Sequence, residues 1–540
     1  MAGIGLRAIW RIFFYGSLIA MSLSLPHLKA EAAPQKEFTN PILWEDLADT
    51  DVLRVGDVFY SMASNMHYAP GAPILSSHDL VHWRYVGHAV PALDFGPGYD
   101  MKDDVAYVRG TWASFLGYRP SNRTFYWGGC VDFKKTYLYT ATAPEGPWHR
   151  HAVLDKCYYD AGLLVDENDT LYIAYGNTRL HVAQLSPDAT QEVRTQEVFH
   201  SSGAIGALEG SRFYKVNGSY YIFTTHPPNG EYVLRSTSGP FGPYVIQKLI
   251  SDVPSPVAGT GAPHQGGIVQ TQAGDWYYMA FVDAYPGGRI PVLAPLRWKK
   301  DGWPEVQLVD GKWGTRYPLP VASSITPQSP LPGFTDDFTT PKLGPEWEWN
   351  HNPDNTKWSA GKGLVLSTAT RTEDLYRARN TLTHRILGPR SVATVVMDVA
   401  GMKDGDFAGL AMLRDSSAWI GVTRKEGAYR IVLKSGLTMD RHWKRFTSGE
   451  VEQSRAVTAG KIWLRATADI RPGNGRETHF SYSLDGKSFH ELGMPFVLNS
   501  DWPFFMGYRF GIFNYATEEL GGSVTVEHFS MMPFGRGKIG

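Results

Sequence analysis

The chain has 540 residues, and its 52 lysines and arginines against 53 aspartates and glutamates leave a formal net charge of −1. A balanced charge argues against a protein that follows a nucleic-acid backbone or an anionic membrane, and the length predicts two or three domains rather than one core. The 17 tryptophans, 28 tyrosines and 26 phenylalanines suit stacked β-architectures and also flat apolar surfaces that bind sugars.

The first 32 residues have the pattern of a cleaved secretory signal. Arg7 and Arg11 precede an apolar run from Ile12 to Leu25, and small residues follow at 30–33. This run is shorter than the roughly 20 residues that span a bilayer, and no later segment is long and apolar enough. We therefore expect a secreted, extracellular protein without a membrane anchor.

Three sequons and two cysteines are compatible with the predicted secretion. The sequons begin at Asn122, Asn168 and Asn217 and are compatible with a secreted glycoprotein. Cys130 and Cys157 can form one disulfide in an oxidising compartment, and two buried free thiols are the alternative. Two cysteines are too few for a disulfide scaffold.

One short pattern occurs five times: a turn pair with Gly, Asn or Asp, followed by an aromatic-rich pair ending in Tyr. The copies lie at 56–60, 122–126, 168–172, 217–221 and 274–278. Each copy predicts a β-hairpin, and repeat units of about 50 residues are typical of propeller blades. The repeat predicts a five-bladed β-propeller over 37–322, with unrelated hairpins in a sandwich as the alternative.

A proline-rich stretch follows and predicts a linker near 320–335. Beyond it, the segments 393–399, 419–423 and 463–468 have the length and apolar pattern of strands. The second half, over 334–536, is therefore predicted to be a β-sandwich, and the whole protein to be all-β.

Three acids lie at comparable points just before or near strands of different repeats: Asp49, Asp160 and Glu209. Acids of different blades can converge at the central channel of a propeller. Glycoside hydrolysis needs such a set, because one carboxylate activates water while a carboxylic acid protonates the leaving oxygen. The sequence pattern alone does not distinguish these three from the other acids.

Four motifs in order resemble glycoside hydrolase family 43. They are Asn40-Pro-Ile-Leu-Trp with 48–57, Tyr159-Asp-Ala-Gly-Leu-Leu with the following turn, Leu208-Glu-Gly-Ser-Arg-Phe, and Pro263-His-Gln-Gly-Gly. The second half, with Asp336-Asp-Phe-Thr and 347–352, resembles the concanavalin A-like, jelly-roll sandwich attached to β-xylosidase-type members. The resemblance implies a propeller enzyme that requires no cofactor.

Carried over by position, the resemblance implies that Asp49 is the general base and Glu209 the general acid. It implies that Asp160 raises the pKa of the acid and helps to orient it. Asp51 is the rival of Asp49, since it lies two residues along the same strand. A turn-capping role is the alternative for Asp160.

The resemblance also implies substrate and metal contacts. Arg289 matches a Gly-Arg motif that contacts substrate, and a surface arginine is the alternative. His264 corresponds to a histidine at the propeller axis that contacts a bound calcium ion or its waters, and a hydrogen-bonded structural histidine is the alternative. Trp112 and Trp127 are candidate stacking platforms for sugars, with core packing as the alternative.

Two departures from the family pattern leave the sugar specificity open. Thr50 stands where Pro is frequent, and Asp160-Ala-Gly stands where Asp-Pro-Ser is frequent. We expect an exo-acting, inverting glycosidase that releases terminal α-L-arabinofuranose from plant arabinoxylan, or a β-1,4-xylosidase acting on xylan oligosaccharides. A non-catalytic carbohydrate-binding protein is a further alternative. An invertase-like retaining enzyme is disfavoured, because its Asn-Asp-Pro-Asn and Glu-Cys motifs are absent.

Overall fold

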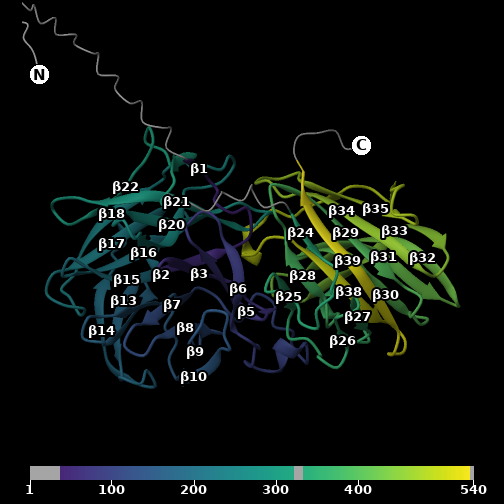
Figure 1. Ribbon diagram of the computed structural model, residues 1–540, viewed down its shortest axis with the longest axis horizontal. Helices are drawn as coiled ribbons and strands as arrows, with labels where there is room; N and C mark the ends of the chain where they lie inside the picture. Colours follow the sequence, from purple (N-terminus) through teal and green to yellow (C-terminus); the bar gives the residue numbers. More distant parts are fainter. Residues whose placement is uncertain (1–36, 322–332, 535–540) are drawn as a thin grey trace, which may run out of the picture. The chain divides into compact units, whose positions relative to one another are not determined.

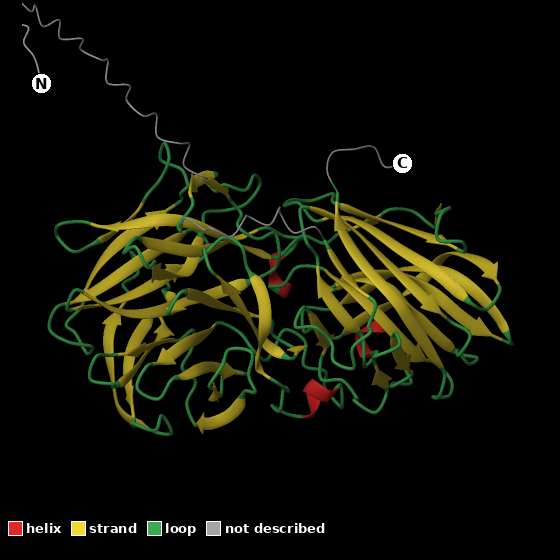
Figure 2. Cartoon of the chain, in the orientation of Figure 1, coloured by secondary structure: helices red, strands yellow, loops and turns green. Residues whose placement is uncertain are grey.

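The computed structural model describes residues 37–321 and 333–534. The predicted signal at 1–32 and the last two residues of the predicted sandwich lie outside these ranges. Figure 2 shows strands and loops with very little helix, and the fold is all-β as expected. The helical elements of the described residues are three short 3₁₀ turns, η1 (Pro97–Asp100), η2 (Leu375–Arg377) and η3 (Trp502–Phe504). In these two ranges, no helix has the length and apolarity needed to cross a membrane.

The first half forms a β-propeller of five antiparallel sheets with four strands each (Figure 1). This confirms the predicted architecture. The blades in chain order are β2 (Ala48–Val55), β3 (Val58–Ser64), β5 (Gly71–Ser77) and β6 (Arg84–Val90); β7 (Ser114–Arg119), β8 (Thr124–Val131), β9 (Lys135–Ala141) and β10 (His149–Leu154); β11 (Gly162–Val165), β12 (Leu171–Asn177), β13 (Arg179–Leu185) and β14 (Glu192–His200); β15 (Glu209–Val216), β16 (Ser219–His226), β17 (Gly230–Ser236) and β18 (Val245–Ser251); and β19 (His264–Gln270), β20 (Trp276–Asp283), β21 (Arg289–Trp298) and β22 (Pro304–Val306).

Each copy of the sequence repeat forms the hairpin between the first and second strand of one blade. The turns need residues that tolerate positive φ, as at Gly56 (61°), Asn217 (49°) and Gly274 (94°). The aromatic pair after each turn starts the second strand, which packs between neighbouring blades. Turn chemistry and aromatic packing together explain why the repeat marks the blades.

The first strand of every blade contacts the first strands of its neighbours, from β2 through β7, β11 and β15 to β19 and back to β2. These five strands therefore enclose the axis of the propeller. The ring closes where β19 contacts β2. The two ends of the propeller segment, β1 (Glu37–Thr39) and β23 (Arg316–Pro318), pair in a separate two-stranded sheet.

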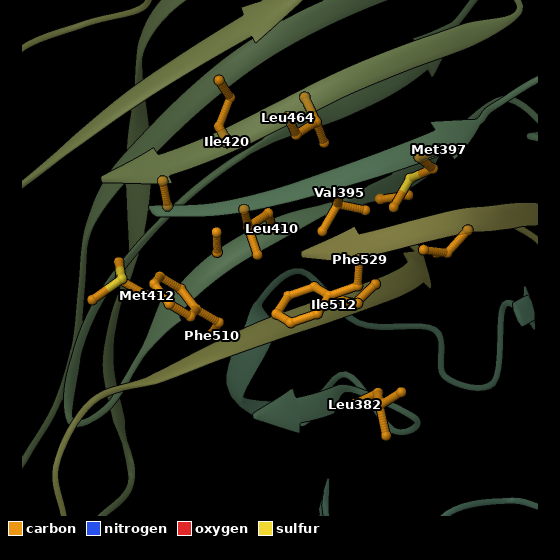
Figure 3. Packing of buried hydrophobic residues seen from close by; sticks show 14 of the residues in the cluster. Leu382, Val395, Met397, Leu410, Met412, Ile420, Leu464, Phe510, Ile512 and Phe529 are labelled. Atoms are coloured by element: carbon orange, nitrogen blue, oxygen red, sulfur yellow. The ribbon is translucent and has the colours of Figure 1, made fainter. Parts of the chain in front are cut away.

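The second half is a sandwich of two large antiparallel sheets. Leucine, valine, methionine and phenylalanine side chains of both sheets fill its core (Figure 3). One sheet contains β24 (Phe334–Asp336), β26 (Trp358–Ser359), β27 (Leu364–Ser367), β29 (Arg390–Asp398), β34 (Lys461–Asp469), β35 (Glu477–Ser483), β36 (His490–Glu491), β37 (Phe496–Val497) and β39 (Ser523–Pro533). The other contains β25 (Trp347–Asn350), β28 (Leu382–Arg385), β30 (Asp406–Leu413), β31 (Ser416–Lys425), β32 (Ala428–Met439), β33 (Arg445–Val457) and β38 (Arg509–Ala516).

A strand of the propeller segment extends the second sheet of the sandwich. β4 (Tyr68–Ala69) pairs with β25, so that Ala69 lies opposite Trp349. Beside this pairing, Glu348 is fully buried and forms ion pairs with Arg385 and Arg509 of the sandwich. Its Oε1 also lies within hydrogen-bond distance, 3.0 Å, of Nε2 of His88 in the first blade. Buried charges require such partners, so the two halves share a charged, hydrogen-bonded interface.

The two cysteines form a disulfide, which decides between the two alternatives left open by the sequence. It joins the end of β8 at Cys130 to Cys157, three residues before Asp160. The bond therefore ties one hairpin of the second blade to the segment that carries one of the candidate acids.

Replacing both Cys130 and Cys157 by serine is expected to lower the free energy of unfolding by about 3 kcal/mol. The reason is that the bond closes a loop with a sequence separation of 27, and the unfolded chain regains that freedom. Denaturant titration of the two proteins measures the change. A reductant should destabilise the native protein but not the double variant, and unchanged stability in the variant would contradict this expectation.

Candidate active site

Three of the five inner strands begin with the same irregularity, a β-bulge. β2, β15 and β19 each shift register within their first few residues. Asp49 (φ 56°), Gly210 (70°) and Gln265 (42°) hold the left-handed conformation in these bulges. Because a bulge redirects the neighbouring side chains, the repeated bulge presents Asp49, Glu209 and His264 at the same end of the propeller channel.

Asp49 is buried and its two carboxylate oxygens have different partners. Oδ2 accepts a hydrogen bond of 2.6 Å from the Ser64 hydroxyl at the end of β3. Oδ1 lies 2.8 Å from Nη1 of Arg289, the first residue of β21. The guanidinium carries the charge opposite to that of a carboxylate, so Asp49 has an ion-pair partner in its buried position.

Glu209, the first residue of β15, is half-buried, and its hydrogen-bond partners are uncharged, unlike the arginine beside Asp49. Its Oε2 accepts hydrogen bonds from the Tyr159 hydroxyl at 3.2 Å and from Nδ2 of Asn177 at 2.5 Å. Burial raises the pKa of Glu209, the two hydrogen bonds oppose that rise, and the charge of Asp49 adds to it. Glu209 therefore retains its proton to a higher pH than an ordinary glutamate.

Asp160 precedes β11 and also has a positive φ of 49°. Burial raises its pKa well above the ordinary value, and the charges of Glu209 and Asp49 raise it further. The three acids of the sequence prediction therefore lie close enough to influence one another. Repulsion between Asp160 and Glu209 is mutual, so an ionised Asp160 favours the protonated form of Glu209.

Asp51, the rival of Asp49, contacts groups that hold neighbouring blades together. Oδ2 of Asp51 accepts a hydrogen bond of 3.1 Å from the main chain of Leu116 in the second blade, and Oδ1 lies 3.6 Å from Nε of Arg212. Arg212 also donates to the main-chain oxygens of Asp49 and Ala161. Asp51 and Arg212 thus join the inner strands beneath the candidate acids.

Arg289 is buried, which excludes the surface position considered as its alternative. It contacts Asp49 through Nη1, and its Nε donates to the main-chain oxygen of Phe505 in the sandwich at 3.2 Å. Its Nη2 is buried and has no hydrogen-bond partner in the described part of the chain. A donor in this state, beside a carboxylate, is suited to binding a sugar hydroxyl.

His264 lies at the start of β19 with protein groups beside both ring nitrogens. Nε2 is 3.3 Å from Oδ2 of Asp283, and Nδ1 is 3.4 Å from the Thr225 hydroxyl. Within residues 37–321 and 333–534, no three acidic, histidine or cysteine side chains are grouped as metal ligands. These residues do not by themselves fit a calcium site, and no chemical step below depends on one.

The two candidate tryptophans differ in position. Trp127 is fully buried in the core of the second blade against Tyr139, so it cannot serve as the expected stacking platform. Trp112 is partly buried and packs its ring against Phe505, with centroids 4.9 Å apart.

Exposed aromatic rings flank this site on both halves of the protein. Phe133 on the β8–β9 turn is 68% exposed, and its ring stacks on Tyr159 with centroids 5.9 Å apart. Trp502 of the sandwich is 62% exposed and lies against Phe505. Flat rings beside buried polar groups are suited to binding sugars.

Sequence reasoning did not identify Ser64, Tyr159, Asn177 or Phe505. Tyr159 had a signal, because it adjoins Asp160 in the second motif. The others lie in strands or turns that contact the acids only after folding.

Both halves of the chain match families of known proteins. Residues 38–304 match the model described as glycosyl hydrolases family 43, and residues 335–532 match that of the β-xylosidase C-terminal concanavalin A-like domain. A solved GH43 glycoside hydrolase, engineered to display both endo-xylanase and exo-arabinofuranosidase activity, is 47% identical, with 92% of this chain and 99% of that chain covered and a TM-score of 0.89.

Two curated relatives carry different names. A β-xylosidase of Formosa agariphila is 28% identical over 91% of this chain and 90% of its own length. A non-reducing end α-L-arabinofuranosidase of Bacteroides ovatus is 29% identical over 60% of this chain and 63% of its own. Both activities hydrolyse pentosides.

Proposed function

Because the chain belongs to glycosyl hydrolase family 43, and is therefore a glycoside hydrolase, we propose that it is an exo-acting, inverting enzyme that releases terminal α-L-arabinofuranose from arabinoxylan. That the protein hydrolyses glycosidic bonds follows from its family, and its relatives are named for xylosidase and arabinofuranosidase activity. Family 43 enzymes need no catalytic cofactor. The sugar, the linkage and the stereochemistry are the parts that we propose.

In the proposed mechanism, Asp49 accepts a proton from water while the water oxygen attacks the anomeric carbon. The bond from that carbon to the leaving oxygen breaks, and Glu209 donates its proton to this oxygen. The charge of Asp49 raises the pKa of Glu209, and Asp160, whose own pKa both of these carboxyl groups raise, helps to orient the acid. Nη2 of Arg289 holds a hydroxyl of the sugar.

The observation that carries this proposal is the contrast between the two carboxyl groups. Asp49 lies against the Arg289 guanidinium and receives a hydroxyl hydrogen bond, which suits an ionised base. Burial and a neighbouring carboxylate raise the pKa of Glu209, which suits a protonated acid. General acid–base catalysis is served by one carboxyl group paired with a cation and one with a raised pKa, and a protein that only binds sugars has no need for this pair.

The arabinose preference is supported by the 47% identical enzyme with exo-arabinofuranosidase activity. The exposed rings of Phe133 and Trp502 support a substrate that extends beyond the cleaved sugar. A β-1,4-xylosidase acting on xylan oligosaccharides is the second candidate, because the Formosa agariphila relative has that name and matches most of the chain. We also propose secretion, supported by the signal-like segment and by the disulfide.

The sugar preference can be tested by incubating the purified protein with arabinoxylan, with an aryl α-L-arabinofuranoside and with an aryl β-xyloside. We expect free arabinose from the polymer and faster cleavage of the arabinofuranoside. Xylose as the main product would favour the second candidate. If neither sugar were released, the proposed substrate class would be wrong.

The stereochemistry has a separate test. Proton NMR during the first turnovers should show the anomer opposite to that of the substrate, because a water activated by Asp49 attacks from the face opposite the leaving group. Buffer-catalysed mutarotation should then equilibrate the two anomers. A first product with retained configuration would contradict the role of Asp49 as base.

The pH dependence provides a test of Asp160. Activity should fall as pH rises through the raised pKa of Glu209, because the acid then loses its proton. Asp160→Asn removes the carboxyl group that repels Glu209 when both are ionised, and should therefore move this alkaline limit of kcat/KM to lower pH. An exposed control, Asp155→Asn, should leave the limit in place, and an unmoved limit in Asp160→Asn would argue against the coupling.

A further inference from the structure

Asp46 joins three segments of the chain beside the catalytic acids. It is 7% exposed, and its Oδ1 accepts a hydrogen bond of 2.8 Å from the main-chain N–H of Arg289. Its Oδ2 accepts one of 2.9 Å from the main-chain N–H of Gly507. One carboxylate therefore connects the segment leading to Asp49, the turn before β21 and a loop of the sandwich.

The sandwich loop, residues 505–508, also contacts the turn at 286–288, which leads to Arg289. The main-chain N–H of Tyr508 donates to the oxygen of Pro286 at 3.1 Å. A Cβ atom at Gly507 would lie only 2.4 Å from the main-chain oxygen of Gly287, so the two backbones touch without room for a side chain. Phe505 receives the hydrogen bond of the Arg289 side chain.

As a result, Arg289 is fixed at three of its nitrogens. Asp46 holds its main-chain N–H, Phe505 holds Nε, and Asp49 holds Nη1. The remaining Nη2 is buried and has no hydrogen-bond partner among the described residues, and it is the donor that we assign to the substrate. The orientation of that donor thus depends on Asp46 and on the sandwich loop, neither of which contacts Asp49 through a side chain.

We propose that Asp46 is a positioning residue, which locks the sandwich loop 505–508 onto Arg289 and thereby orients Arg289 toward Asp49 and the substrate. This inference rests on the proposed function, in which Arg289 and Asp49 serve hydrolysis. It gives the sandwich a part in catalysis through main-chain contacts. The main-chain oxygen of Asp46 is held separately by Nε of Arg385, so the side chain can be changed without releasing the backbone.

The first test is Asp46→Asn. An asparagine has one acceptor oxygen, so it can accept only one of the two main-chain hydrogen bonds, and its NH₂ group faces the other N–H. We expect kcat/KM to fall about 10- to 100-fold, as for the loss of a hydrogen bond to a charged group. Asp79→Asn is the control, because Asp79 is also a buried aspartate, in the first blade. Its Oδ1 accepts two main-chain hydrogen bonds, and its Oδ2, which the change replaces, lies 2.6 Å from Nδ1 of His82.

The second test approaches the same junction from the sandwich. Gly507→Ala should push the loop away from Gly287, because the new methyl group would overlap its oxygen. We expect a loss of kcat/KM similar to that of Asp46→Asn. Both variants should be compared with the control well below their melting temperatures, and Asp79→Asn should lose stability but keep its kcat/KM.

A double-mutant cycle with Arg289→Ala distinguishes positioning from a general structural effect. If Asp46 and Gly507 act through Arg289, their effects on kcat/KM should largely vanish in the Arg289→Ala background. Effects that persist in full there, or an unchanged kcat/KM in Asp46→Asn, would overturn the inference. Full activity of Arg289→Ala itself would instead overturn the proposed site, and the inference with it.

Discussion

Glu209→Ala is expected to lower the hydrolysis of natural glycosides by about 10²- to 10⁴-fold, the range of general acid catalysis. The leaving oxygen of a sugar or polymer needs a proton, and the variant has no group to supply it. An aryl glycoside with a good leaving group needs little protonation. Its hydrolysis should therefore recover a large part of the lost rate, which a comparison of kcat/KM on the two substrates measures.

The matched control for this experiment is Glu167→Ala. Glu167 is an exposed glutamate of the third blade whose ion pair is with Lys215. This variant should hydrolyse both substrates with the same kcat/KM as the native protein. Equal losses on good and poor leaving groups in Glu209→Ala would count against its role as the acid.

Asp49→Asn is expected to reduce turnover on every substrate, by a similar 10²- to 10⁴-fold, while the protein stays folded. Asparagine suits this position because it tolerates the left-handed backbone conformation that Asp49 adopts in the bulge. An amide cannot accept the proton of the attacking water. A better leaving group should therefore give no recovery, in contrast to the Glu209 variant.

The comparison with Asp51→Asn separates catalysis from folding. Asp51 is buried beside Arg212 and accepts a main-chain hydrogen bond, so its replacement leaves the arginine without its partner. We expect a lower melting temperature from this change, but a kcat/KM that is largely retained well below that temperature. Asp49→Asn also leaves an arginine, Arg289, without its partner, so turnover is the measurement that distinguishes the two variants. If Asp51→Asn abolished turnover and Asp49→Asn retained it, the two assignments would have to be exchanged.

The sequence by itself determined the architecture of this protein. The five copies of the turn-and-aromatic pattern predicted five blades, because a hairpin is encoded locally by residues that tolerate positive φ and by the aromatic strand after it. The strand segments after the prolines likewise predicted the sandwich, since alternation of apolar residues is a local property. The resemblance of four motifs to family 43, in the order of that family, then pointed to Asp49, Asp160 and Glu209 among the acids of the chain.

Only the tertiary structure decided how these acids differ. The pKa of Glu209 depends on burial and on neighbours distant in sequence, such as Asn177. The ion pair of Asp49 likewise depends on a distant residue, Arg289. The structure likewise separated Asp49 from Asp51, because a bulge between them breaks the alternation that would place them on one face. The burial of Trp127 also became evident only in the structure. The sequence of a strand does not reveal which of its faces another blade will cover.

The part of the sandwich in the site also required the folded chain. Phe505 and Gly507 reach Arg289 and Asp46 across more than 200 residues of sequence. No local pattern encodes such a contact, because main-chain hydrogen bonds between distant segments depend on backbone position and not on residue type. The sequence thus determined the elements and the chemical groups, whereas packing between distant segments decided which of those groups meet and with what charge.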